Sequence, residues 1–294
     1  MVTATYLLQL VVAGVTVGSI YAIIAVSFNI IFKSTDALNF AQGDWVMMGG
    51  MIAATSYATG SMPVWLACVV GVVVVGMVGV LSQRLTIYPL KQPSPLIITM
   101  ISIGLALCTK SLVMIFLGKM PMGYPSFSGD QPLALMGAQI QPQSIWIIAI
   151  TLLFMVAVHY FFEKTLMGKA MRAVAADRNA ASLVGINVRR SGMWTFMIAA
   201  LAGGVAGVII TPMTLTAYDV GGVLGFKGFS AAMLGGLGSL HGAFIGGILL
   251  GVAEALAGGL ISSQFKDAVS FILLLLVLFL RPNGLLGKEV ITKV

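Results

Sequence analysis

The sequence predicts an all-α polytopic membrane protein that forms a single transmembrane domain over residues 1–294. Hydrophobic residues make up 59% of the chain and charged residues only 9%, whereas about a quarter of a soluble domain is charged. The mean hydropathy is +1.04. Apolar stretches of roughly 20 residues, long enough to cross a bilayer core as helix, recur along the whole chain. These observations exclude a water-soluble fold.

The predicted spans follow one another along the chain. The seventh is short and interrupted by glycines, so it is either a full crossing or a half-helix, which gives about eight or nine transmembrane helices. Glycines spaced four apart, such as Gly14 and Gly18, favour close packing of these helices. The spans are expected at residues 6–32, 39–59, 64–85, 95–117, 143–162, 191–212, 225–240, 243–261 and 268–280.

The basic residues indicate which way the helices run. Only Lys119 is basic in the loop 118–142, whereas the loop after the fifth span holds Lys164, Lys169, Arg172, Arg178, Arg189 and Arg190. The positive-inside rule places that basic loop in the cytoplasm. Counting crossings then puts Arg84, Lys91, Arg281, Lys288 and Lys293 in the cytoplasm and the N-terminus outside, provided that the second span crosses fully. The basic residues behind the net charge of +7 sit in loops between spans, so the charge gives no reason to expect a nucleic-acid partner, and membrane lipid is the expected surrounding of the spans.

The cytoplasmic loop, about residues 163–190, is polar and alanine-rich and is predicted to form two short helices. Asp177 is expected to cap the second helix and Gly185 to end it. The small residues Ala170, Ala173, Ala176 and Ala180 would give a smooth outward surface that fits a groove on another protein. The alternatives are a helix that lies on the lipid surface and, for Asp177, a cap without any partner contact.

A weak internal similarity links two segments of the chain. Residues 39–44, followed by 47–50, resemble residues 226–230, followed by 233–236, in placement and composition. The first segment starts on the cytoplasmic side and the second on the external side, as inverted repeats require, so a substrate path is expected between them. The alternative is that the glycines only allow close helix crossing. The candidate path residues are Asn39, Gln42, Asp44, Phe226, Phe229 and Ser230; for Asp44, stabilisation of a helix N-terminus is the alternative.

Other ionisable residues within the spans are expected to have structural partners. Glu254 lies deep in the eighth span and should pair with another helix or line a wet cavity. Lys110 is a candidate counter-charge, and Lys227 is expected to be an interfacial anchor or to meet an anionic ligand near the external mouth. The histidines lack a second ligand at helical spacing and the two cysteines lie in apolar spans, so no metal, cofactor or disulfide is predicted.

Four ordered motifs resemble one known family. The stretch 39–44 reads Asn-Phe-Ala-Gln-Gly-Asp, where LivH-type permeases of branched-chain amino acid ABC transporters have His and Glu at the positions of Gln42 and Asp44. The stretches 167–187, 226–256 and 281–287 resemble the family's cytoplasmic loop, a second hallmark and its terminal motif. The resemblance runs from Gly14 nearly to the end of the chain.

This resemblance implies an importer with a homologous second permease subunit, two ATPase subunits and a periplasmic solute-binding protein, in the bacterial inner membrane. The implied substrates are branched-chain or other apolar amino acids. Urea, short amides and aromatic carboxylates are the alternatives, because related permeases carry them. The loop would be a coupling-helix element that docks on an ATPase through Gly168, Lys169, Arg172, Ala173, Ala176, Asp177, Ala180 and Gly185.

The chain lacks the G-x-x-x-x-G-K-[ST] motif that holds nucleotide phosphates. Any ATP would therefore be bound and hydrolysed by partner subunits, and this subunit is not expected to be an enzyme. An intramembrane aspartyl protease is disfavoured because no G-x-G-D follows Tyr218-Asp219. A secondary transporter is the stronger alternative, since inverted repeats and carboxylates within spans occur there too.

Overall fold

The computed structural model describes residues 4–60, 62–90, 94–129, 131–135, 138–281 and 283–287. Lys91, Lys288 and Lys293, which were assigned to the cytoplasm, lie outside these ranges. The helices are α1 (Ala4–Thr35), α2 (Gln42–Ala58), α3 (Val64–Ser82), α4 (Pro95–Phe116), α5 (Pro142–Lys164), α6 (Leu166–Ala176), α7 (Arg178–Leu183), α8 (Val188–Thr214), α9 (Val220–Gly235), α10 (Leu240–Leu260) and α11 (Lys266–Leu280). A π-helical turn (Gln83–Ile87) extends α3, a 3-10 turn (Ser263–Phe265) precedes α11, and β1 (Leu133–Leu135) pairs antiparallel with β2 (Ala138–Ile140).

Within the described residues, seven helical segments are long and apolar enough to cross a membrane: α1, α3 with its π-helical turn, α4, α5, α8, α10, and α11 with the 3-10 turn before it (Ser263–Leu280, 18 residues). The helices α2 and α9 are shorter, with 17 and 16 residues. The predicted all-α polytopic fold is confirmed. The seventh span was placed too late in the sequence, at 225–240, because Ser239 caps a new helix by accepting a hydrogen bond from the backbone N–H of Gly242, so Leu240 already belongs to α10.

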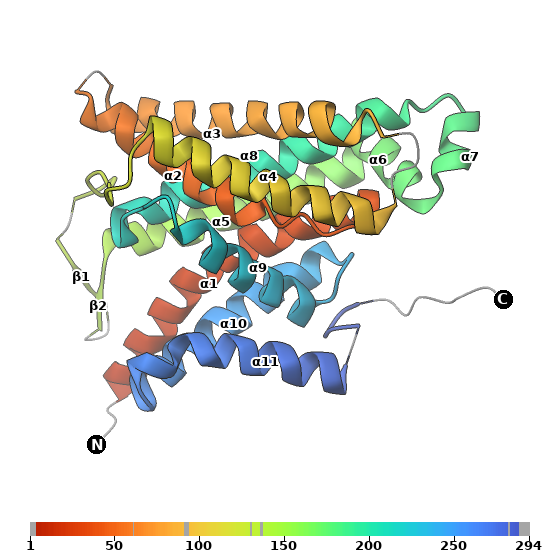
Figure 1. Ribbon diagram of the computed structural model, residues 1–294. Coiled ribbons are helices and arrows are strands. Elements are labelled where there is room, and N and C mark those ends of the chain that lie inside the picture. The colour runs from red at the N-terminus through yellow and green to blue at the C-terminus, as the bar shows by residue number, and fades with distance from the viewer. Residues whose placement is uncertain are drawn as a thin grey trace.

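The helices pack in two blocks with α9 between them (Figure 1). One block holds α1 with α10 and α11, and the other holds α2 to α5 and α8. The close approach of α1 and α10 uses Gly14 and Gly18 against Gly247 and Gly251, so the predicted glycine packing is found here. The core lies along α1, α2 and α8, whereas α3, α4, α5 and α11 expose large apolar side chains on their outer faces. Such faces suit contact with lipid.

The two ends of the bundle carry different elements. The start of α1 and the β1–β2 hairpin lie at one end, and α6, α7 and the end of α11 lie at the other (Figure 1). This arrangement matches the predicted topology, in which the basic loop and Arg281, just after the last span, share the cytoplasmic side. We therefore call the end with α6 and α7 the cytoplasmic end and the opposite end the external end.

The cytoplasmic loop folds as its sequence predicts, into the two short helices α6 and α7. Asp177 caps α7, since its Oδ1 accepts hydrogen bonds from the backbone N–H groups of Asn179 at 2.8 Å and Ala180 at 3.0 Å. Gly185 follows α7 with a φ of +83°, a left-handed conformation that suits glycine. The corner between α6 and α7 is therefore fixed by local chemistry.

Candidate functional site

The short helix α2 begins inside the protein, after a non-helical segment that enters from the cytoplasmic end. The segment 36–41 runs along α4, where Thr99 Oγ1 accepts a hydrogen bond from the backbone N–H of Leu38 at 3.3 Å and Ser102 Oγ accepts one from Phe40 at 3.0 Å. These two hydroxyls satisfy backbone groups that would otherwise be unpaired at membrane depth.

The short helix α9 is reached from the opposite end. Thr216, just after α8, forms a pair of backbone hydrogen bonds with Met122 in the external loop, each 2.8 Å long. The chain then turns inward and starts α9 at Val220. The broken segments that precede α2 and α9 therefore enter from opposite ends, which is the arrangement that inverted repeats predict.

The first turns of α2 and α9 touch each other. Gly43 packs directly on the backbone of Gly221 and Gly225, and a side-chain carbon at Gly43 would overlap the carbonyl oxygen of Gly221. The ring of Phe40 lies 6.4 Å from that of Phe226 and 5.9 Å from that of Phe229, measured between centroids. The two segments that resemble each other in sequence thus meet in the interior, and the predicted path residues gather around this contact.

The α2 side of the contact carries buried polar atoms. Gln42 is fully buried and its Nε2 donates a 2.8 Å hydrogen bond to the carbonyl oxygen of Ala199 on α8. Among the described residues, no hydrogen bond is made by Asn39 Nδ2, Gln42 Oε1 or Trp45 Nε1. An unpaired buried polar atom costs about 1–3 kcal/mol. Three such atoms on residues spaced three apart, from the segment before α2 into its first turn, therefore form an unusual cluster of buried polar groups. The sequence analysis missed Trp45, whose spacing of three from Gln42 was the available signal.

The remaining path candidates have more ordinary surroundings. Asp44 is buried in the first turn of α2 beside Gly221, which agrees with the alternative that its carboxylate stabilises a helix N-terminus. The Ser230 hydroxyl donates a hydrogen bond to the carbonyl oxygen of Phe226 within α9. Phe226 is half-exposed and Phe229 is partly buried. Asn39 and Gln42 are therefore the candidates with free hydrogen-bonding capacity.

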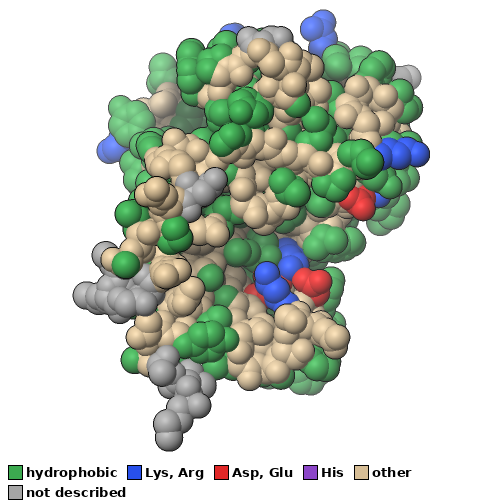
Figure 2. All heavy atoms as spheres, turned by 90° about the vertical axis from the view of Figure 1, so that its left-hand side faces the viewer, with side chains coloured by type: hydrophobic (Ala, Val, Ile, Leu, Met, Phe, Trp, Pro, Cys, Tyr) green, Lys and Arg blue, Asp and Glu red, His purple; other side chains and the backbone are tan. Residues whose placement is uncertain are grey.

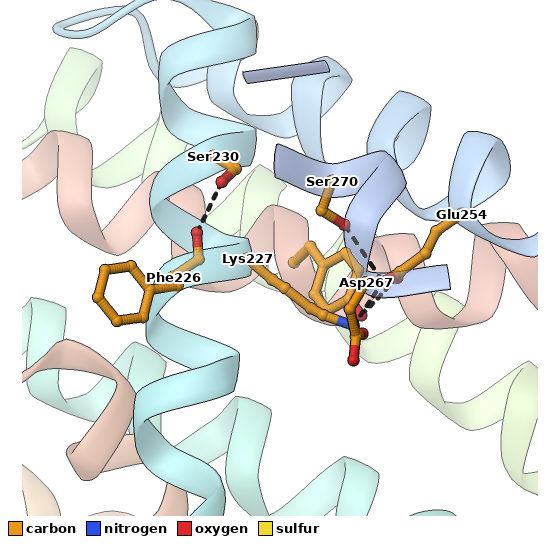
Figure 3. A network of polar contacts seen from close by, with 7 residues as sticks. Phe226, Lys227, Ser230, Glu254, Asp267 and Ser270 are labelled. Atoms are coloured by element: carbon orange, nitrogen blue, oxygen red, sulfur yellow. Dashed lines mark hydrogen bonds and ion pairs between the residues drawn. The ribbon is translucent and has the colours of Figure 1, made fainter. Parts of the chain in front are cut away.

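Glu254 has a structural partner, as predicted, but that partner is not Lys110. The Lys227 ammonium forms an ion pair with Glu254 and a second one with Asp267, 2.6 Å from its Oδ1. Tyr21 donates a 2.7 Å hydrogen bond to Glu254, and Ser270 lies 3.2 Å from the same carboxylate. Figure 3 shows Lys227 extending away from Phe226 toward both acids.

The roles predicted for Lys110 and Lys227 differ from what the structure shows. Lys110 lies 5.5 Å from the centroid of the Tyr218 ring, because α4 is in the block opposite α10. The anchor and ligand roles expected for Lys227 are both wrong for this state, since its side chain is 9% exposed and doubly paired. The packing of α9, α10 and α11 against one another, which sets the partners of Lys227, could not be predicted from a single sequence.

The predicted docking residues divide by exposure. Lys169, Ala176, Asp177, Ala180 and Gly185 are exposed, and Arg172 and Ala173 are partly exposed. Gly168 is buried in the corner between α5 and α6, where a side-chain carbon would overlap Phe161, so it supports the loop's shape and does not present a surface. The sequence analysis missed three apolar side chains on this loop, Leu166, Leu183 and Val184, which are 85%, 87% and 76% exposed.

The terminal motif caps the end of α9. The backbone N–H groups of Leu285 and Leu286 donate to the carbonyl oxygens of Leu234 and Gly235, at 2.9 and 3.0 Å. Asn29 on α1 adds two bonds from its Nδ2, to the carbonyl oxygens of Gly236 and Ser239. The cytoplasmic end of α9 is therefore held on two sides, a role of Asn29 that the sequence analysis did not identify.

Comparisons with known proteins agree with this architecture. The chain matches the family described as "Branched-chain amino acid transport system / permease component" over residues 10–278. It is 36% identical to the high-affinity branched-chain amino acid transport system permease protein LivH of Salmonella typhimurium and 33% identical to BraD of Pseudomonas aeruginosa, each alignment covering 98% of both chains. A solved structure, PsaBC from Streptococcus pneumoniae in complex with Fab, shares the fold with a TM-score of 0.51 at 11% identity, covering 96% of this chain and 94% of that one. The chain therefore belongs to the family of branched-chain amino acid transport system permease components.

Proposed function

We propose that the chain is the permease subunit of an ATP-driven importer in the bacterial inner membrane and that it carries branched-chain or other apolar amino acids. The observation that carries the proposal is the contact between the first turns of α2 and α9, which enter from opposite ends and meet in the interior. Half-helices that meet in this way flank substrate sites in many transporters. The named substrate of the full-length relatives supports the amino acid assignment.

The cytoplasmic loop supports a role for partner ATPases. Its helices α6 and α7 present small residues together with the apolar side chains Leu166, Leu183 and Val184 at the cytoplasmic end. Exposed apolar side chains rimmed by polar residues are typical of interaction sites. In this proposal two ATPase subunits bind and hydrolyse ATP, the loop docks on one of them, and a second permease subunit and a periplasmic solute-binding protein complete the importer.

The test is reconstitution of the tagged chain in proteoliposomes with its co-purified partners. We expect uptake of radiolabelled leucine that requires both ATP inside and the binding protein outside. Leu183→Asp should abolish ATP-dependent uptake by placing a charge on the docking surface, while Lys119→Gln, at an exposed position of the external loop, should leave it unchanged. Leucine uptake that follows an ion gradient and ignores ATP would replace this proposal with a secondary transporter.

A further inference from the structure

An apolar cavity opens between the two short helices toward the external end. It has a volume of about 290 Å³ and is lined by side chains of α1, α2, α8 and α9, among them Val17, Val46, Met47, Val223 and Leu224. Ligand cavities usually measure about 300–1,000 Å³, so this one is near the lower limit and suits a solute of amino acid size.

One cation borders this cavity. Lys266, the first residue of α11, lines it together with Tyr21, and it also lines a neighbouring cavity of about 310 Å³ that reaches Glu254. Within the part of the chain that the structure describes, the Lys266 side chain forms no direct hydrogen bond or ion pair, although its charge acts on the neighbouring Asp267 carboxylate; Lys227 pairs directly with both Glu254 and Asp267. Figure 2, which views the external end, shows acidic and basic side chains side by side in a hollow. The Lys266 ammonium is thus a cation at the edge of an apolar cavity that is not engaged in a direct ion pair.

The charge balance of this cluster selects among ligands. Lys227 and Lys266 carry two positive charges, and Glu254 and Asp267 carry two negative ones. A ligand with only a carboxylate would leave the cluster with a net negative charge beside Glu254, whose side chain is fully buried and near which unbalanced charge is costly. A neutral amide or urea would leave Lys266 unpaired. A zwitterion can pair its carboxylate with Lys266 and bring an ammonium beside the acids without changing the net charge.

We propose that this cavity is a binding site for zwitterionic amino acids with apolar side chains, in which Lys266 pairs with the ligand carboxylate and the cavity wall of α2 and α9 receives the side chain. The inference rests on the proposed function and deepens it. It assigns the permease subunit its own contribution to selectivity and disfavours urea, short amides and simple aromatic carboxylates at this site.

The test uses the full-length chain in lipid nanodiscs, with Cys68→Ala and Cys108→Ala and a reporter, Val223→Cys, in the cavity wall. Leucine is expected to slow maleimide labelling of the reporter. Leucinamide, which lacks the carboxylate, and 4-methylpentanoate, which lacks the ammonium, should each need at least about tenfold higher concentration, since one lost charged contact is worth about a factor of ten. Lys266→Gln should raise the leucine concentration for half-protection about tenfold. The leucinamide concentration for half-protection should stay the same. Lys119→Gln, which removes the same charge from an exposed position in the external loop, is the matched control.

Each outcome bears on one claim. Leucine protection that is equal in the parent chain and in Lys266→Gln overturns the site, as does a Lys266→Gln effect that appears only when anionic lipid is present, because the cation then meets a lipid phosphate. If one of these two results is found and the reconstituted parent chain still takes up leucine with ATP, the proposed binding site is wrong and the proposed function stands. Absence of that uptake would count against the proposed function itself.

Discussion

Arg178, at the start of α7, donates a 2.7 Å hydrogen bond from its Nη2 to the backbone carbonyl oxygen of Ser34, near the end of α1. The chain leaves α1 one residue later, and the segment 36–41 leads from there to the buried first turn of α2. Val174 and Met171 of α6 are buried against the bundle beside this contact. A displacement of the cytoplasmic loop would therefore be transmitted directly to the entry of α2.

Arg178→Ala is expected to weaken the link between the loop and α2. A hydrogen bond from a charged donor is worth about 1.5–3 kcal/mol, so leucine uptake should fall about tenfold while ATP hydrolysis by the co-purified partners continues. Arg190→Ala is the matched control, because Arg190 is exposed on the same loop and makes no side-chain hydrogen bond within the described part of the chain. Equal uptake by the two variants would show that this contact carries no coupling.

Gly43→Ala is expected to disrupt the contact between α2 and α9. The added carbon would overlap the Gly221 carbonyl, and overpacking of a close-packed interior costs about 1–3 kcal/mol or more. We expect uptake to fall at least tenfold, measured beside the yield of folded protein from gel filtration. Gly222→Ala is the control on α9, since a carbon there meets no other atom within 4 Å. A fully active Gly43→Ala variant would show that transport does not require the close contact between α2 and α9.

Lys227→Met is expected to destabilise the protein by leaving the buried Glu254 without its counter-charge. Removing one partner of a buried ion pair typically costs about 3–5 kcal/mol. The double variant Lys227→Met/Glu254→Met should lose less than Lys227→Met alone, because no buried charge remains. Asp267→Asn should have little effect, since the Asp267 side chain is 66% exposed. Unfolding in mixed micelles measures the three differences, and additive losses for the double variant would contradict a buried pair.

The sequence predicted what depends on local chemistry and composition. The caps at Asp177 and Gly185 follow from backbone preferences, and the spans follow from hydrophobicity, so α6, α7 and the long helices lie where they were expected. The similarity between 39–44 and 226–230 predicted a substrate path between the two segments. The structure brings the segments into contact, and the path itself stays a prediction.

Partners between distant helices could not be predicted in this way. Glu254 pairs with Lys227 on α9 and not with Lys110 on α4, and Asn29 reaches the end of α9, a separation of 207 residues from Gly236. Hydrophobicity along a span does not tell which neighbours it packs against, because lipid and protein interiors are equally apolar. The exposed Leu183 and Val184 were missed because only the alanines of the loop were considered for its outward surface.

Cysteine labelling from the two sides of the membrane tests the topology, and Gln143 and Arg178 are poor positions for the cysteines. Gln143 is buried and its Nε2 donates to the carbonyl oxygen of Ile209 at 2.8 Å, so a cysteine there would disturb the fold and react slowly. Gln131 and Ala180 are exposed at opposite ends. With Cys68→Ala and Cys108→Ala as the parent, we expect a membrane-impermeant maleimide to label Gln131→Cys in intact cells and Ala180→Cys only after the membrane is opened, because the positive-inside rule fixes α6 and α7 in the cytoplasm. The unlabelled parent is the control, and labelling of both positions in intact cells would overturn the assigned direction of every helix.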